Sequence, residues 1–495
     1  MRFLMALHIV SLLAGIANSE RIRGSFRGRD KTRRLQNTDE GNGEEEGGGP
    51  KAKENPPTVS PSRSPSPSRS PSRSPSVSPS PSASSSPSVM PSQTPSLKPS
   101  RHISEIERML TDQYALWGGI EFRTSDSTYW MKALQWVEST NTTGLPDWRI
   151  GQRYAMACIF FATNSVSTDY TDSLMGSGFE GFTFNWLHKW LEHPSAGENE
   201  CDFWGVVCNT DMAVVELNLK SNWMSGVFPN EVVILENSLE VLDLERNIMM
   251  SNYDEDELWF LIRLTNLRVL NLGKTGFRFS GLPPYIANLA KLTDLVLYST
   301  LFFGPMDDTI FENMTALEYL DLGALSFDSP FPSTLQNLPN LTFVYLDYSE
   351  FTGNLTSLIG DGSGFPSLRE LWVDDNNLEG SIPSAIGSIS SLESLSMSEC
   401  QLTGDMPTEL GQLSSMRLMW FFGNQLSGNI PSEIGGMSNL ELFKVHRNDL
   451  TGSMPSEICN QHIPLFILDV LTADCQDGEV TCQQGLCCTC CGDDC

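Results

Sequence analysis

The chain has 495 residues, of which 40% are hydrophobic, and a formal net charge of −29. Residues 1–101 hold 15 Lys/Arg and 8 Asp/Glu, which leaves 17 basic and 53 acidic groups for residues 102–495, a net charge of −36. Nucleic acid and anionic membrane surfaces repel such a domain, so we expect neither as a partner. The acidic surface can attract cations or basic partners, or it can serve only to keep the protein dissolved in salty surroundings.

Residues 1–19 have the pattern of a secretion signal: Arg2, an apolar run from Phe3 to Ala17, and small residues at Ala17 and Ser19. The run is too short for a membrane span, and no later stretch reaches about 18 unbroken apolar residues. We therefore expect a secreted, extracellular or cell-wall-associated protein with no transmembrane segment. Residues 20–55 are a basic and then acidic low-complexity segment, and the "KTRR" at its basic end resembles a dibasic processing site, so residues 20–34 are a candidate pro-segment.

Residues 56–101 are rich in Pro and Ser and contain almost no large apolar side chains. Such a composition cannot bury a core, and in the polyproline conformation it would form a stalk on the order of 140 Å long. In the cytoplasm or nucleus, its Ser-Pro-Ser-Arg repeats would suggest a phosphorylated segment of the kind found in splicing factors. Behind a signal peptide we favour an O-glycosylated spacer or a tether to the wall.

Residues 102–213 are predicted to begin with helices. Helical spacing of apolar residues appears in "ISEIERMLTDQYALWGG", "TYWMKALQWVES", "WRIGQRYAMACIFFATN" and "FNWLHKWLEH". Cys201 and Cys208 then flank a short loop directly before an alternating run, and a redox pair, a metal site and a structural cap are all candidates. Redox pairs are usually Cys-x-x-Cys, and one cysteine pair alone makes no zinc site.

From Val214 the chain repeats. The first Leu-type position recurs ten times after Val214. Eight of these ten intervals are 24 or 25 residues long, and the other two are 28 and 27 residues long. The positions are Val214, Leu239, Leu267, Leu292, Leu317, Leu341, Leu368, Leu392, Met416, Leu440 and Leu465. A fixed period of this size indicates a solenoid, in which each unit buries its apolar face only against its neighbours.

The repeat "LRELWVDDNNLEGSIPSAIGSISS" is the clearest unit. In Leu-x-x-Leu-x-Leu, alternate residues point inward, so each repeat is predicted to form one short strand whose leucines enter a shared core. Asn at the ninth position has an amide that can bond backbone groups where the chain leaves the sheet. It occurs at Asn222, Asn247, Asn376, Asn424 and Asn448, whereas Leu325 and Ser349 replace it in two looser repeats.

The Leu-x-Gly-x-Ile-Pro segments resemble those of the plant-type leucine-rich repeat family. The resemblance implies an α/β solenoid: a right-handed superhelix with a parallel β-sheet on its concave face and about ten repeats over residues 214–464. It also implies an N-terminal helical cap stapled by a Cys201–Cys208 disulfide, with Phe203, Trp204 and Val206 covering the first strand. A Cys-rich C-terminal cap is expected over residues 465–495. The N-terminal helices further resemble secreted repeat proteins of microalgae such as diatoms.

Twelve cysteines in an exported chain favour disulfides. Cys158 lies in an apolar helix and Cys400 takes the Asn position of its repeat, so we expect both to be buried thiols. Cys459–Cys475 is the pairing we favour at the C-terminal end. Thiolate metal binding is the competing interpretation of the last six cysteines, because Cys-x-Cys spacing suits soft metals. They are Cys482, Cys487, Cys488, Cys490, Cys491 and Cys495.

No catalytic set is recognisable, and we expect no enzyme activity, cofactor or catalytic metal. His188 and His193 lack the His-Glu-x-x-His spacing of a zinc protease, and "GDGSGF" lacks the Gly-x-Ser-x-Gly pattern of a hydrolase. No phosphate-binding loop or kinase signature occurs.

The strand pattern instead predicts a row of aromatic residues on the solvent side of the concave sheet. Aromatic rings on such a surface indicate a partner site, unless inserts or glycans cover them. The candidate ligand-binding residues are Tyr298, Tyr319, Phe343, Tyr345, Tyr348, Trp372, Asp374, Trp420, Phe422, Lys444 and Arg447, with Asp294, Asp321, Asp347 and Asp375 interleaved. Lys444, His446 and Arg447 would make the far end basic.

Four Asn-x-Ser/Thr sequons, at Asn141, Asn313, Asn340 and Asn354, are candidate glycosylation sites. The leading hypothesis is a non-catalytic, receptor-like or inhibitor-like recognition protein that binds an extracellular protein or a cell-wall carbohydrate on the concave face. The second hypothesis is a structural component of the extracellular matrix with an acidic, cation-binding surface.

Overall fold

The computed structural model describes residues 104–114, 129–163, 199–222, 224–247, 249–250, 258–460, 470–474, 480–481, 488 and 490–491. The predicted signal sequence, the stalk, the helix over "FNWLHKWLEH" and Cys475 lie outside these residues.

The repeats form one long sheet, as predicted. Its 13 strands pair in chain order, and every pairing is parallel except that of the first strand with the second. The strands are β1 (Val206–Cys208), β2 (Val214–Asn218), β4 (Val241–Asp243), β6 (Val269–Asn271), β8 (Asp294–Val296), β10 (Tyr319–Asp321), β11 (Phe343–Tyr345), β13 (Glu370–Trp372), β15 (Ser394–Ser396), β17 (Leu418–Trp420), β19 (Leu442–Lys444), β21 (Val470–Ala473) and β22 (Cys490–Cys491). We call it the main sheet.

A second parallel sheet follows the main sheet around each coil from the middle of the chain onward. It contains β12 (Thr352–Gly353), β14 (Asn377–Gly380), β16 (Gln401–Asp405), β18 (Gln425–Asn429) and β20 (Asp449–Thr451). Earlier coils have two-stranded pairs instead: β3 (Ser225–Gly226) with β5 (Met249–Met250), and β7 (Arg278–Ser280) with β9 (Leu301–Phe303).

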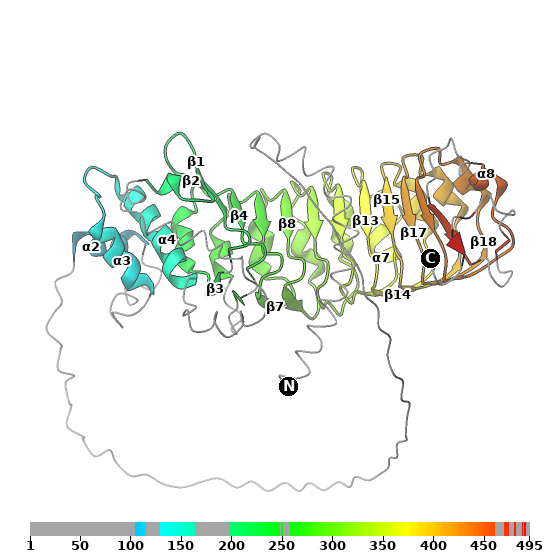
Figure 1. Cartoon of the computed structure of the whole chain (residues 1–495), viewed down its shortest axis with the longest axis horizontal. Helices are drawn as coiled ribbons and strands as arrows, with labels where there is room; N and C mark the ends of the chain where they lie inside the picture. The colour runs from blue at the N-terminus through cyan, green and yellow to red at the C-terminus, as the bar shows by residue number, and fades with distance from the viewer. Residues whose placement is uncertain are drawn as a thin grey trace, which may run out of the picture. The chain divides into compact units, whose positions relative to one another are not determined.

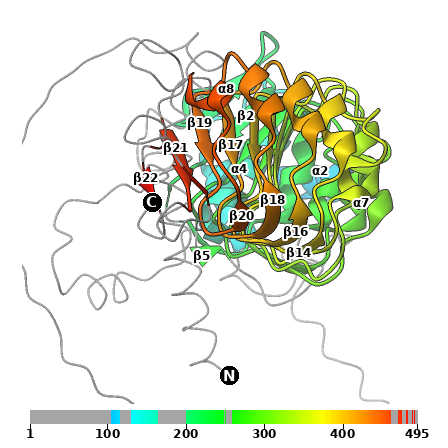
Figure 2. The same ribbon diagram turned by 90° about the vertical axis from the view of Figure 1, so that its right-hand side faces the viewer.

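Short helices complete the coils. They are η4 (Asn230–Leu235), η5 (Trp259–Ile262), η6 (Pro284–Asn288), η7 (Asp308–Phe311), η8 (Ser333–Asn337), α7 (Thr356–Ile359), η9 (Ser384–Ser388), η10 (Thr408–Gln412), η11 (Ser432–Gly436) and α8 (Ser456–Cys459). The strands of the main sheet lie side by side along the stack in Figure 1. The end-on view in Figure 2 shows the second sheet along one edge of the coil and the short helices on the side opposite the main sheet.

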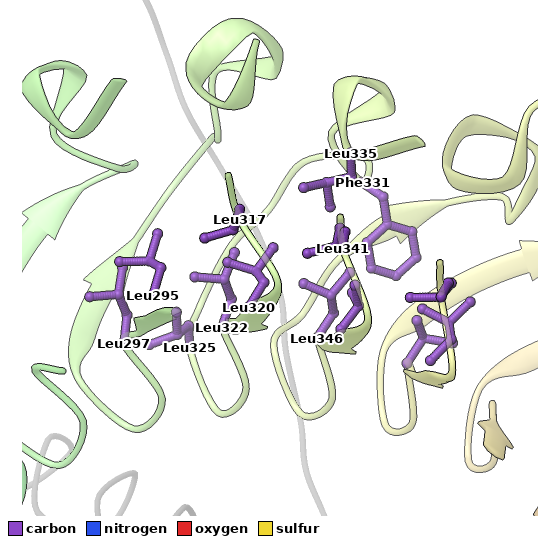
Figure 3. Packing of buried hydrophobic residues seen from close by; sticks show 14 of the residues in the cluster. Leu295, Leu297, Leu317, Leu320, Leu322, Leu325, Phe331, Leu335, Leu341 and Leu346 are labelled. Carbon is purple, nitrogen blue, oxygen red and sulfur yellow. The ribbon is translucent and has the colours of Figure 1, made fainter. Parts of the chain in front are cut away.

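The core runs through all the coils and consists largely of the predicted leucines. All ten described first Leu-type positions, from Val214 to Leu440, are at most 1% exposed. Leu295, Leu320 and Leu346 from successive repeats point into the same interior, as Figure 3 shows. Because each buried leucine contributes roughly 1.5–3 kcal/mol only when a neighbouring coil covers it, the repeats stabilise one another.

The N-terminal helices α2 (Glu105–Tyr114), α3 (Tyr129–Ser139) and α4 (Asp147–Thr163) form their own apolar cluster. α4 is tied to the first coil through the buried carboxylate of Glu200, which accepts hydrogen bonds from Arg149 Nε (2.8 Å), Arg153 Nε (2.9 Å) and Gln152 Nε2 (2.8 Å). Burial of Glu200 opposes ionisation, but these donors outweigh it and hold the pKa of the carboxyl below its usual value.

The loop between Cys201 and Cys208 lies at the open end of the main sheet. The two cysteines form the predicted disulfide, and β1 pairs antiparallel with β2. Phe203 and Val206 are buried, but Trp204 is 41% exposed, so the prediction that Trp204 covers the first strand is wrong. Gln152 takes part of that role by accepting a hydrogen bond from the Val214 amide (2.7 Å).

Four further cysteines agree with the predicted division. Cys158 and Cys400 are buried thiols, and Cys459 and Cys488 are each in a disulfide. The predicted partner of Cys459 lies outside the described residues, so the Cys459–Cys475 pairing stays a prediction.

A polar ladder crosses the coils where the chain leaves the main sheet. Asn376 donates from Nδ2 to Leu346 O and Val373 O (both 2.9 Å) and accepts from the Phe351 amide (2.9 Å), so one side chain joins consecutive coils. Ser349, which replaces Asn in its repeat, joins its coils in the same way, because it donates to Leu322 O (2.7 Å) and accepts from the Leu325 amide (3.3 Å).

The residue just before each ladder position adopts a left-handed backbone conformation. Its φ lies between 50° and 68° in ten successive coils, at Ser221, Arg246, Lys274, Ser299, Ala324, Tyr348, Asp375, Glu399, Gly423 and Arg447. Nine of these are not glycine, although a side chain makes this conformation costly by roughly 1–2 kcal/mol. We infer that the ladder hydrogen bonds hold the bend.

We predict that Asn376→Ala lowers the free energy of unfolding by about 3 kcal/mol, because two carbonyls and one amide lose their buried partner. Asn377→Ala is the matched control: this neighbouring residue is exposed, and its loss should change stability by less than about 0.5 kcal/mol. Urea unfolding followed by circular dichroism measures both. Equal stability of the two variants would contradict the assigned role of the ladder.

Candidate ligand-binding face

The side chains that alternate with the core leucines form the outer face of the main sheet, which is the predicted concave face. The sheet register brings them into rows that run across the strands. One row passes through Asp321, Tyr345, Trp372, Ser396, Trp420 and Lys444. A second row, two residues later in each repeat, passes through Asp347, Asp374, Ser398, Phe422 and His446.

Five predicted aromatic residues are in contact with one another on this face. Tyr319 lies 5.9 Å from Phe343 and 5.5 Å from Tyr345, measured between ring centroids. Tyr345 meets Trp372 edge to face at 5.2 Å, and Trp372 lies 5.6 Å from Trp420. We call these five residues, from β10 to β17, the aromatic row. Each such pair is worth about 0.5–1.5 kcal/mol beyond its buried area, so the row is preorganised.

The prediction that these rings are exposed is only partly correct. Tyr345, Trp372 and Trp420 are 7%, 5% and 8% exposed, whereas Tyr319 and Phe343 are partly exposed. The reason lies in β15, where Ser394 and Ser396 are too small to separate the two indoles.

Trp372 Nε1 donates a hydrogen bond to Ser394 Oγ (3.0 Å), and Ser396 lies between Trp372 and Trp420 in the sheet register. The two indole rings therefore pack over the serines and against each other. The two serines are the sequence signal that would have predicted this burial.

Tyr298 is not part of the aromatic row. Its ring lies over Gly273, where a Cβ atom would approach to 2.6 Å, and its hydroxyl donates to Glu245 Oε1 (3.0 Å). Glu245 also accepts from Lys220 Nζ (2.6 Å) and Asn271 Nδ2 (3.1 Å). Tyr298 is 4% exposed, so the structure contradicts its assignment as an exposed contact residue and gives it a role in this polar network.

The C-terminal end of the face is less basic than predicted. Lys444 Nζ lies 6.0 Å from the centre of the Trp420 ring, and burial lowers the pKa of this lysine. Arg447 is paired with Glu399. Phe422 and the buried His446 are stacked at 4.9 Å with an interplanar angle of 4°.

Carboxylates lie beside the aromatic row. Asp347 is 2% exposed, and Asp374 on the adjacent strand accepts hydrogen bonds from Ser396 Oγ and from the Ser398 amide (2.8 Å). Asp375 follows in the left-handed bend and is hydrogen-bonded to Tyr348. We call Asp347, Asp374 and Asp375 the acidic cluster.

Burial raises the pKa of Asp374 to about 7; the hydrogen bond from Ser396 opposes the shift, and the charges of Asp347 and Asp375 add to it. Burial also raises the pKa of Asp375 to about 6. The hydrogen bond from Tyr348 lowers this pKa, whereas the charge of Glu399 raises it further. The folded protein therefore holds these carboxylates in an environment that disfavours their charge.

The predicted glycosylation residues Asn141, Asn313, Asn340 and Asn354 are all exposed, which suits modification. Asn340 Nδ2 donates to Thr315 O (2.9 Å), so this residue also links two coils. Within the described residues, no group of three or more His, Cys, Asp or Glu side chains is placed to hold a metal ion. None of the described helices is both long enough and apolar enough to cross a membrane.

We predict that Asp374→Asn stabilises the protein at pH 8 and has no effect near pH 4. The folded pKa of about 7 lies above the ordinary value of 3.8, so wild-type stability falls as the pH rises through this window. The full shift would correspond to about 4 kcal/mol; since Asp374 keeps some exposure, we expect about 2 kcal/mol at pH 8. Thermal unfolding from pH 4 to 8 measures it.

Asp449→Asn, at an exposed position of β20, removes the same charge as a control and should leave the difference between pH 4 and pH 8 unchanged. A destabilised Asp374→Asn variant at pH 8 would contradict the predicted cost of burying this charge.

The family described as Leucine Rich Repeat matches residues 367–389 and 391–413, which are the repeats of β13 and β15. Two curated relatives from Arabidopsis thaliana are "Receptor-like protein kinase 7", 30% identical over 213 residues, and "Receptor-like protein 18", 32% identical over 194 residues. These matches cover 42% and 36% of this chain but only 21% and 22% of the relatives, so the chain spans about a fifth of their length.

Two solved structures from Arabidopsis thaliana are also similar. The ectodomain of the receptor kinase GASSHO1/SCHENGEN3, in complex with CASPARIAN STRIP INTEGRITY FACTOR 2, is 23% identical with a TM-score of 0.49, over 62% of this chain and 34% of that chain. The second is the receptor kinase HAESA in complex with the peptide hormone IDA and the co-receptor SERK1. It is 23% identical with a TM-score of 0.47, and the match covers 62% of this chain and 53% of that chain. The strand order and the matched repeats together show that the fold is a leucine-rich-repeat α/β solenoid.

Proposed function

We propose that this protein is a non-catalytic recognition protein that binds a segment of an extracellular protein on the outer face of the main sheet. The aromatic row carries the proposal: five rings from four strands touch one another on a face where the strand pattern leaves room for a partner. Preorganised aromatic side chains give a partner a large contact area at a small cost in conformational entropy.

The burial of the indoles favours a protein over a carbohydrate. Sugar rings bind tryptophan by stacking on an open face of the indole, but the rings of Trp372 and Trp420 cover each other. Ring edges, together with the partly exposed Tyr319 and Phe343, suit an extended polypeptide whose side chains insert between them. The names of the curated relatives as receptor-like proteins add support for a receptor-like role.

Export is part of the proposal. It is supported by the signal-like residues 1–19, the Pro/Ser-rich residues 56–101, the Cys201–Cys208 disulfide and the four exposed sequons. In this proposal the protein is secreted or wall-associated, as in the microalgal proteins that its N-terminal region resembles, and residues 56–101 hold the solenoid away from its anchor.

We predict that the double variant Trp372→Ala/Trp420→Ala loses capture of its partner. Immobilised wild type and variant are incubated with an extracellular extract of the source organism, and the bound proteins are quantified by mass spectrometry. Because these two indoles are the largest rings of the row and pack against each other, we expect the variant to retain less than about a tenth of the partner, the loss typical of tryptophans that anchor an interface.

Trp148→Ala is the matched control, since Trp148 is 41% exposed on α4 and lies outside the main sheet. Circular dichroism must show that the double variant is folded under the capture conditions, and Phe343→Ala, a less buried member of the row, gives a milder second test. Capture of the same proteins by wild type and by every folded row variant would refute the site.

A further inference from the structure

We propose that the ligand is a basic, extended polypeptide segment, whose arginine or lysine side chain binds the acidic cluster while its neighbouring side chains lie along the aromatic row. This inference rests on the proposed function and deepens it by assigning the charge of the ligand. It concerns Asp374, a predicted contact residue, together with Asp347 and Asp375, which the sequence analysis treated only as residues interleaved with the aromatics.

The geometry places negative charge and aromatic edges side by side. Asp374 is two residues beyond Trp372 on the same outer face, and Asp347 occupies the equivalent position beyond Tyr345 on the neighbouring strand. Adjacent strands are about 4.8 Å apart, so one guanidinium or ammonium group can reach both carboxylates.

The basic side chains elsewhere on this face are already engaged. Lys220 pairs with Glu245, Arg447 pairs with Glu399, and Lys444 lies over Trp420. Within the described part of the chain, no salt bridge reaches Asp374 or Asp375. The charge of Arg447 acts on Asp375 and favours its ionised form, but no cation is among the causes that act on Asp374. Since burying a charge without a cationic partner is unfavourable, the acidic cluster gains most, at Asp374, from a cation that a ligand brings.

A buried hydroxyl provides a second, independent observation. Ser398 follows Asp374 in the same row and is 1% exposed, and its amide donates to the Asp374 carboxylate. Its side-chain oxygen has no hydrogen-bond partner among the described residues. Buried hydroxyl groups are normally hydrogen-bonded, so Ser398 Oγ is an acceptor that a ligand N–H can satisfy.

The length of the row sets the size of the ligand. β10 to β17 are five neighbouring strands, which span about 19 Å at about 4.8 Å per strand. An extended chain of about six residues covers that distance at about 3.3 Å per residue. A polypeptide crossing the strands therefore places one basic side chain at the acidic cluster and apolar or aromatic side chains along the row, a fit that a lone metal ion does not offer.

The test uses the full chain and three fluorescein-labelled probes: hexa-arginine, hexa-lysine and hexa-glutamate. Binding is measured by fluorescence anisotropy in 0.15 M and 0.5 M salt, because salt screens the general field of an acidic protein more than a partly buried contact. The variant Asp374→Asn/Asp375→Asn is compared with Asp405→Asn/Asp449→Asn, which removes the same charge from the exposed strands β16 and β20.

We expect hexa-arginine to bind the Asp374→Asn/Asp375→Asn variant at least tenfold more weakly than wild type, and the charge-matched control less than twofold more weakly, with no binding of hexa-glutamate. Equal losses in the two double variants, or no binding of hexa-arginine to wild type in 0.15 M salt, would overturn the inference. If partner capture still depends on Trp372 and Trp420 in that case, the proposed function stands and only the assigned charge is wrong.

Discussion

Everything in this molecule depends on the inability of one coil to bury its own leucines. A repeat of 24 or 25 residues presents a row of apolar side chains that only the coils before and after it can cover, so the core is continuous from Val214 to the last described repeat. The ladder side chains join the backbones of consecutive coils, and the left-handed bends complete the turn. One consequence is a sheet whose outer face can vary more than its core, because the buried leucines, and not the outer side chains, form the continuous interior.

The outer face uses this freedom in three different ways along the chain. Near its start, the Tyr298 hydroxyl donates a hydrogen bond to Glu245, so these polar groups are already engaged and are poor contacts for a partner. In the middle, the aromatic row lies beside Asp374 and Asp375, which no salt bridge among the described residues reaches. Toward its end, Arg447 and Glu399 neutralise each other. A ligand can therefore form the most favourable new contacts in the middle of the face. The burial of Asp374 there disfavours its charge and costs stability, and functional sites commonly retain such a cost.

The sequence predicted the solenoid well because its signal is local and repeated. Spacing alone located the leucines and the Asn ladder, and the resemblance to plant-type repeat proteins located the Cys201–Cys208 disulfide. Three features were missed, and each depends on residues far apart in the chain. The indoles are buried because β15 carries serines, the bends are left-handed at nine non-glycine residues of many types, and Glu200 is held by α4 about 50 residues earlier. Single-repeat patterns do not contain these relationships.

Hydrogen–deuterium exchange with and without the captured partner tests the central claim most directly, namely that recognition takes place on the middle of the main sheet. The account predicts slower exchange on partner binding in the segments that carry β10, β11, β13 and the bend at Asp375, with no change in η8 or η9 on the opposite side of the coil. Protection confined to those short helices, or to the N-terminal helices α2 to α4, would contradict it.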